Sequence, residues 1–341
     1  MRAVAGIDAG FEARLVRGPH APEMLGMRRT VFVLEPRWLR WCRPPAPTRD
    51  RRHRAAARRE ARRRPGPPRG PASWLDELAA RIDGHLAEVG EAPAKELSAA
   101  IPELATKLHL AIGKPYAGTT GLGSQLLGVL AAEGRIVRTR PLGSWTSSQF
   151  RWARTADWLG APIAPLDPAA ARATLVRRWL EQFGPGTVED VAWWSGLPVG
   201  QVRAALATVG AQEVDLDGGQ IGLVADGDVE PTPAQPPVAA LLPSLDPTTM
   251  GWKQRAWYLG DHGPQLFDRN GNGGATIWWD GRIVGGWVQR PSGEIALGVL
   301  EDVGREGRDA IDRAAEALVA FYGDVRARSR FPAPIERDLL A

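Results

Sequence analysis

Cysteine is nearly absent from this chain of 341 residues, and Cys42 is its single example. One thiol cannot form a disulfide within the chain, and it is too few for a cysteine-based zinc site. Long apolar runs are also missing, because no stretch reaches the roughly 20 residues of a membrane-spanning helix, and no signal peptide is found. We therefore expect a cytoplasmic protein with no membrane partner. A hydrophobic share of 44% provides enough apolar residues for two or three domain cores.

Motifs for metals, nucleotides and nucleophilic catalysis are incomplete. Residues 268–273 begin like a calcium loop, but Trp279 stands where such a loop needs a glutamate. The Gly-Leu-Gly tripeptide at 121–123 lacks the third glycine and the strand context of a dinucleotide site. No Ser/His/Asp set can be placed, and no metal-ligand spacing joins the five histidines, His20, His53, His85, His109 and His262. We therefore expect neither a metal nor a cofactor.

The formal net charge of +4 comes from one block of the chain. Residues 37–70 contain 13 arginines and only two acids, Asp50 and Glu60. The rest of the chain has 30 basic and 37 acidic side chains, a balance of about −7. Any DNA-binding face outside the block must therefore be a local patch of cations.

The Arg/Pro-rich segment at 37–72 admits three interpretations. Its prolines and dense charge oppose a long helix and burial. It is a disordered arm that binds nucleic acid, a solvated linker with no binding role, or a stretch translated in a shifted reading frame. The third is favoured, because GC-rich coding sequence read out of frame gives runs of Arg, Pro, Ala and Gly. We expect it to lie outside any packed core, so limited proteolysis should cut there first.

Residues 187–207 have the pattern of two short helices joined by a tight turn. Thr187 suits an N-cap, and Gly196 suits a helix end. Pro198 begins the second helix at a position that needs no backbone N–H. Two strand-like runs follow within 212–224, and the Asp-Gly-Gly turn between them favours a hairpin.

Helix, turn, helix and hairpin is the order of a winged helix, although any small helical hairpin beside a β-ribbon shares it. The same order occurs at 73–164, and the spacing of the two copies is too irregular for a solenoid. The predicted fold is α+β, with tandem winged-helix domains at 73–164 and 165–226. A small β-barrel-like domain, or a curved sheet, with a C-terminal helix is expected at 236–325, and residues 1–36 are expected to be the remnant of a first winged helix.

Four segments carry a family resemblance: MLGMRRTVFV at 24–33, FGPGTVEDVAWWSGLP at 183–198, LLPSLDPTTMGWKQRAWYLG at 241–260 and LFDRNGNGGATIWWDGRIVGGW at 266–287. They resemble the bacterial winged-helix DNA-binding-domain family, which includes alkylpurine DNA glycosylases that unhook interstrand crosslinks. The resemblance covers 73–325 well and 24–36 in part. It implies tandem winged helices and a β-barrel arranged around a channel for double-stranded DNA.

The chain departs from that family where the chemistry would lie. The glycosylase members carry a Gln-x-Gln or Gln-x-Asp catalytic motif upstream of the segment that resembles 24–33, and no such motif occurs in 1–23. A truncated start and a frame error would explain the departures, and the catalytic residues stay unknown. We expect a monomer that binds duplex DNA weakly without base excision. The alternatives are an active glycosylase for alkylated or crosslinked DNA, a transcriptional regulator, and a structural protein that binds no DNA.

The predicted DNA contacts gather around the hairpin of the first complete winged helix. Its loop at 143–148 is rich in hydroxyls that could bind phosphates, and Trp145 could wedge between bases. The simpler interpretation is an ordinary hydroxyl-rich loop. Arg28 and Arg29 could instead pair with core acids, and Lys253 could face solvent. The predicted set is Arg28, Arg29, Arg138, Arg140, Trp145, Thr146, Ser147, Ser148, Arg151 and Lys253.

Overall fold

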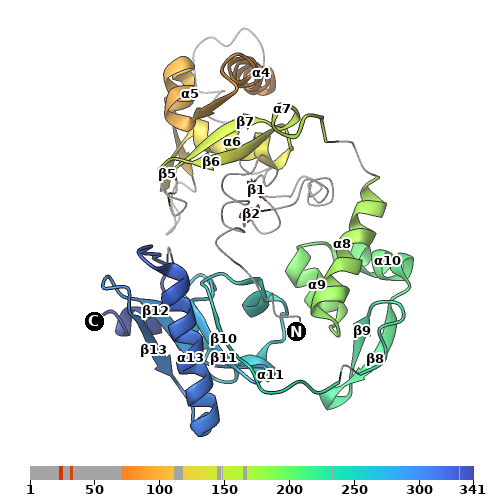
Figure 1. Cartoon of the computed structure of the whole chain (residues 1–341). Coiled ribbons are helices and arrows are strands. Elements are labelled where there is room, and N and C mark those ends of the chain that lie inside the picture. Colours follow the sequence, from red (N-terminus) through yellow and green to blue (C-terminus); the bar gives the residue numbers. More distant parts are fainter. Residues whose placement is uncertain are drawn as a thin grey trace. The chain divides into compact units, whose positions relative to one another are not determined.

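The computed structural model describes residues 23–25, 31–33, 71–110, 118–143, 147, 149–163, 167–231, 233–329 and 331–341. The chain divides into two compact units, unit 1 at 1–175 and unit 2 at 176–341 (Figure 1). The boundary falls inside helix α8 (Pro168–Phe183). The Arg/Pro-rich block at 37–70 lies outside the described residues. The finer division into five segments stays a prediction.

The first described helix of unit 1, α4 (Pro71–Val89), buries one apolar stripe. Leu75, Leu78, Ile82 and Leu86 recur every three or four residues, and all four are buried. The elements in order are α4 (Pro71–Val89), β3 (Glu91–Pro93), α5 (Ala94–Ala100), η2 (Pro102–Ala105), β4 (Lys107–Leu110), β5 (Gly118–Gly121), α6 (Leu122–Ala132), β6 (Ile136–Pro141), β7 (Phe150–Arg154) and α7 (Thr155–Leu159). The predicted order of helices and hairpin at 73–164 is therefore confirmed.

Helix α6 lies in the centre of this unit rather than on its surface. Seven of its eleven residues are buried, and they join the stripe of α4 in one core. A side chain on Gly123 would crowd Leu104, because an added Cβ would lie 3.1 Å from Leu104 Cβ. The helix therefore packs against its neighbours on almost every side.

The sheet of unit 1 has five strands in the order β2-β1-β6-β7-β3. Strands β1 (Glu23–Leu25) and β2 (Val31–Val33) form an antiparallel pair, and β1 joins the rest of the sheet where Glu23 pairs with Arg138 of β6. The strand expected near residues 30–34 thus has partners. Those partners belong to the sheet that also contains β6, β7 and β3, and the assignment of residues 1–36 to a remnant of a first winged helix stays a prediction.

Unit 2 starts with the helices predicted from the sequence. Helix α9 (Val188–Ser195) has Thr187 as its N-cap and ends at Gly196, whose φ is 71°. A second helix, a tight turn and a hairpin follow, which confirms the prediction for 187–224. These elements are α10 (Val199–Val209), β8 (Gln212–Leu216), η3 (Asp217–Gly219) and β9 (Gln220–Val224).

The last part of unit 2 is an open sheet, so the predicted barrel-like closure is wrong. Its strand order is β10-β11-β12-β13, all antiparallel, and β10 and β13 form the two edges. The segment between the first two strands forms short helices instead of further strands, so nothing in the described chain closes the sheet. The strands are β10 (Ala239–Leu242), β11 (Thr276–Trp279), β12 (Arg282–Gln289) and β13 (Ile295–Val299), and the short helices are η4 (Pro247–Met250), α11 (Ala256–Leu259) and α12 (Gly263–Leu266).

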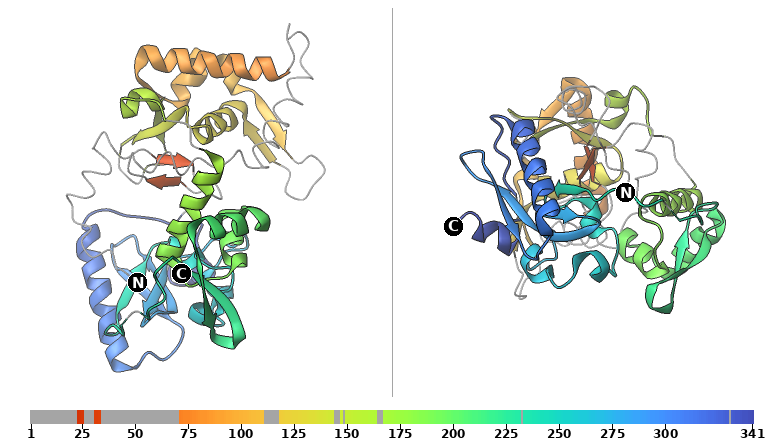
Figure 2. Two further views of the ribbon diagram at one scale, coloured as in Figure 1. Left: turned by 90° about the vertical axis from the view of Figure 1, so that its right-hand side faces the viewer. Right: turned by 60° about the horizontal axis from the view of Figure 1, so that its bottom comes forward.

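Helix α13 (Gly304–Tyr322) covers one face of this sheet (Figure 2). Its Ile311 and Ala315 are buried in the same cluster as Ile277 and Val284 of the strands. The predicted C-terminal helix is therefore confirmed. Among the described residues, no helix is both long enough and apolar enough to cross a membrane.

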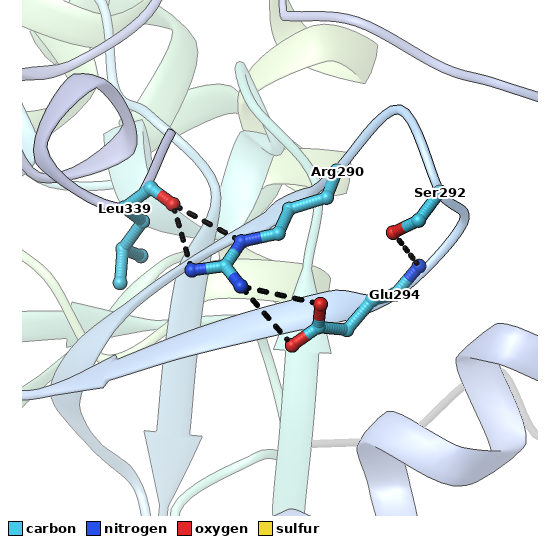
Figure 3. Close-up of polar contacts among 4 residues, drawn as sticks. All are labelled: Arg290, Ser292, Glu294 and Leu339. Atoms are coloured by element: carbon cyan, nitrogen blue, oxygen red, sulfur yellow. Dashed lines mark hydrogen bonds and ion pairs between the residues drawn. The ribbon is translucent and has the colours of Figure 1, made fainter. Parts of the chain in front are cut away.

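A final short helix, α14 (Pro334–Asp338), packs on the sheet beyond the predicted domain end at 325. Gly286 and Gly298 are register partners, and an added Cβ on either would lie within 3 Å of the Ile335 side chain. The absence of a side chain at these two glycines therefore allows α14 to pack closely on the sheet. The end of the chain is held by Arg290, which donates to Leu339 O at 3.2 and 3.3 Å and pairs with Glu294 (Figure 3).

Candidate nucleic-acid interface

Strands β6 and β7 of unit 1 hold the predicted arginines, and Arg138 is the most tightly packed of those described. Arg138 and Trp152 are partners in the antiparallel register, so their side chains share a face. The Arg138 guanidinium lies 5.0 Å from the centre of the Phe150 ring and 5.3 Å from that of Trp152. Cation–π contacts with both rings hold the half-buried side chain against the sheet.

Arg151 occupies the opposite face, because it directly precedes Trp152 in the strand. Its Nε lies 3.8 Å from Glu91 Oε1, and Thr139 donates a hydrogen bond of 2.7 Å to Glu91 Oε2. Glu91 therefore offsets part of the charge of Arg151. Arg140 is exposed. Arg138 and Arg151 lie on opposite faces, and the three arginines differ in how much of their charge reaches solvent.

The hairpin loop itself is described only in part. Gly143 has a φ of 86°, and Leu142 N donates to Gln149 O at 2.7 Å, which closes the loop. Ser147 Oγ accepts a hydrogen bond from Gln149 N at 3.2 Å. This local bond agrees with the simpler interpretation of an ordinary hydroxyl-rich loop for Ser147. Five of the predicted contacts lie outside the described residues: Arg28, Arg29, Trp145, Thr146 and Ser148.

In unit 2, the buried carboxylate of Asp190 connects two segments. Its Oδ2 accepts hydrogen bonds from Thr187 N at 2.9 Å and from Thr187 Oγ1 at 2.7 Å. Its Oδ1 accepts from Lys253 N at 2.8 Å and from Gln254 N at 3.1 Å. One side chain therefore caps helix α9 and fixes a loop 63 residues further along the chain.

Lys253 and Arg255 belong to that loop but differ in exposure. Lys253 is exposed, and its backbone N–H is held by Asp190. The half-buried Arg255 guanidinium lies 4.5 Å from the ring centre of Phe267 and 5.4 Å from that of Trp193. The cation of Arg255 thus serves packing, whereas that of Lys253 extends into solvent.

A groove of about 340 Å³ lies between α9 and the β8–β9 hairpin. Glu189 and Glu213 line it, together with Gln254 from the neighbouring loop. Carboxylates repel phosphates, so this groove does not suit the DNA backbone. Within the described ranges, no group of three or more His, Cys, Asp or Glu side chains could hold a metal ion.

Comparison with known proteins decides the family. The profile described as DNA glycosylase AlkZ-like matches residues 5–321. The chain belongs to the AlkZ-like DNA glycosylase family. A comparison with curated proteins finds no match. The solved structure of the Streptomyces sahachiroi DNA glycosylase AlkZ shares the fold, with a TM-score of 0.68 and 20% identity over 96% of this chain and 85% of that chain.

Membership of the AlkZ-like family agrees with the resemblance seen in the four sequence segments. Sequence reasoning nevertheless missed two residues that organise the surfaces described above. Asp190 was not among the predicted site residues, although the Thr-x-x-Asp spacing from Thr187 is the signal of a capping box. Glu91 gave no signal, because its partner Thr139 lies 48 residues away.

Proposed function

We propose that this chain is a DNA-repair protein that binds double-stranded DNA. The observation that carries the proposal is the family match over residues 5–321, which spans both units. DNA glycosylases act on bases within DNA, so the substrate class follows from the family. We propose in addition that the chain acts as a monomer in the cytoplasm.

Two winged-helix modules, at 73–164 and 165–226, would provide the binding surface. The order α4, β3, α5, α6 and β6–β7 in unit 1 supports the first module, and α9, α10 and β8–β9 support the second. In such modules, the second helix of the helix–turn–helix pair reads the major groove. Helix α10 suits this role because Gln201, Arg203 and Thr208 are exposed on it. Helix α6 is almost wholly buried, so the first module would contact DNA through its hairpin.

The contacts proposed for the hairpin are phosphate contacts. Arg140 is exposed, and Arg151 keeps 37% of its side-chain surface in solvent. The loop hydroxyls predicted from the sequence lie between these strands. Contacts of this kind fix the protein on the duplex but carry no base information. The hairpin contacts therefore add affinity without sequence preference, and any preference would come from α10 in the major groove.

Titration of labelled duplexes by fluorescence anisotropy tests this function. Arg138, Arg140 and Arg151 changed together to Ala should weaken binding to duplexes of different sequence by similar factors. The matched control changes Arg305, Arg308 and Arg313 to Ala, which removes the same charge from exposed positions of α13. Equal losses in the two triple variants would point to net charge alone, and the absence of duplex binding by the wild-type chain would sink the proposal.

We propose further that this chain binds DNA without excising a base. Base excision needs an extruded base and a group that activates water or stabilises the developing sugar cation. In the glycosylases that the sequence resembles, that group belongs to a Gln-x-Gln or Gln-x-Asp motif. Neither motif occurs anywhere in the 341 residues. Phosphate contacts can persist without this chemistry.

The second candidate is an active glycosylase for alkylated or crosslinked DNA. The family match that begins at residue 5 favours it, because the match reaches into the region upstream of β1. The deciding measurement is release of a modified base from an alkylated duplex by the purified chain. We expect release at the background rate, and turnover well above background would establish the second candidate instead.

A further inference from the structure

Trp257, on helix α11 of unit 2, exposes an unusually large apolar surface. Its exposed fraction is 61%, the highest among the exposed large hydrophobic side chains of the described residues. Its ring meets Trp252 edge-on with ring centres 5.3 Å apart, and Tyr258 at 4.8 Å. Tyr258 is fully buried and stacks on Trp278 of the sheet at 5.3 Å. The exposed Trp257 ring therefore packs against buried aromatic rings, and these contacts fix its position.

The backbone before Trp257 is also held firmly. Trp252 Nε1 donates to Phe183 O at 3.0 Å, and Asp190 binds the next two backbone N–H groups. Tyr258 donates its hydroxyl to Thr249 O at 3.1 Å. Burial raises the pKa of Tyr258, so the phenol keeps its proton and this bond into the alkaline pH range.

The side chains that project from this firmly held segment are of three kinds. Lys253 supplies a cation, Gln254 an amide and Trp257 a flat aromatic ring, and all three are exposed. A scaffold of this rigidity orders the binding groups before the ligand arrives, which lowers the entropy cost of binding. An exposed ring and an exposed cation on one short segment match single nucleotides, whose bases stack on aromatic faces and whose phosphates attract lysine.

We propose that Trp257 is a stacking platform for a DNA base that has left the helical stack, with Lys253 on the adjacent phosphate. The proposal rests on DNA binding as the proposed function. It adds a preference for DNA with an unpaired base over fully paired DNA, because a fully paired duplex buries the faces of its internal bases. An unpaired or extruded base exposes a face to Trp257, and such stacking tolerates any base.

The test uses the full chain and three labelled DNAs in anisotropy titrations: a fully paired duplex, the same duplex with one central unpaired adenine, and the corresponding single strand. Trp257→Ala should weaken binding to the bulged duplex and the single strand by roughly 5- to 150-fold, the range for loss of one base–aromatic stack. Binding to the paired duplex should stay within about twofold. Trp257→Phe keeps a ring and should retain most of the affinity for the bulged DNA.

Phe321→Ala is the matched control, because Phe321 is a second exposed aromatic residue of unit 2, with 48% of its surface in solvent. It should change none of the three affinities. Thermal unfolding of each variant checks that the fold is intact. If Trp257→Ala does not fold, the comparison of Trp257→Phe with wild type on the three DNAs still tests stacking.

The outcomes separate this proposal from the proposed function. Wild-type binding to the paired duplex, with equal affinities of Trp257→Ala and wild type for bulged DNA, would overturn the platform and leave duplex binding intact. Trp257-dependent binding to the single strand without duplex binding would support the platform and contradict duplex binding. Loss of a wild-type dimer in Trp257→Ala, with DNA binding unchanged, would assign the ring to a protein contact and overturn the platform, as would no binding to any DNA.

Discussion

At the residue scale, Asp190 shows how one side chain serves two levels of structure. Its carboxylate completes the cap of α9 and also accepts hydrogen bonds from the backbone N–H groups of Lys253 and Gln254. A buried carboxylate is stable only when its oxygens are bonded, and here each oxygen accepts two hydrogen bonds. The loop that presents Lys253 therefore depends on a residue in a helix.

Asp190→Ala should lower the free energy of unfolding by at least about 2 kcal/mol, from a lost cap and from buried donors left without acceptors. Hydrogen exchange of the 249–257 amides should accelerate more than that of α13. The control Asp215→Ala, at an exposed strand position, should stay within about 0.5 kcal/mol of wild type. An unchanged urea midpoint, with 249–257 still protected in Asp190→Ala, would contradict this role.

At the element scale, the β6–β7 hairpin places cations on two faces with different neighbours. Arg138 is held between aromatic rings on one face, and Arg151 is paired with Glu91 on the other. Pairing of partly exposed charges contributes little to stability. Its larger effect here is on binding, because Glu91 lowers the positive potential that a phosphate would meet beside Arg151.

Glu91→Gln should therefore tighten binding to duplex DNA. The glutamine oxygen can still accept the hydrogen bond of Thr139, while the negative charge is removed. The expected gain is up to about fivefold, which corresponds to an exposed ion pair of about 0.2–1 kcal/mol. Glu77→Gln, at an exposed position of α4, removes the same charge and should have a smaller effect. Equal affinities of Glu91→Gln and wild type, measured at low salt, would show that the hairpin does not face DNA.

At the scale of the whole molecule, the charge is divided between a basic block and an acidic remainder. The block at 37–70 contains 13 arginines, and the other residues sum to about −7. Under the proposed function, the chain outside this block would bind DNA against an overall repulsion, through a few local contacts. The basic block either adds to these contacts or stays away from them.

The salt dependence of duplex binding distinguishes these two cases. Each neutralised phosphate contributes about −0.9 to the slope of log K against log salt. The exposed cations of the hairpin and the 253–254 loop amount to a few contacts, so we expect a slope of about −3. A slope near −10 would show that the arginines of 37–70 bind the duplex as well.

The sequence by itself determined the elements whose signals are local. The helix α9 has its cap at Thr187 and its end at Gly196, and the Asp-Gly-Gly turn joins β8 to β9. A cap or a turn involves residues within three or four positions of each other, so its sequence pattern is sufficient. The four long segments were likewise enough to indicate the family.

Only the tertiary structure decided which elements meet. The pairing of β1 with β6, the open edges of the four-stranded sheet and the bond from Asp190 to Lys253 all join residues far apart in the chain. Apolar periodicity shows that a strand or helix has a buried face, but it does not specify the partner of that face. The same limit applies to Trp257, whose ring is exposed although its aromatic neighbours Trp252 and Tyr258 are buried. Composition assigns all three to a core, and the packing of α11 on the sheet decides which one remains in solvent.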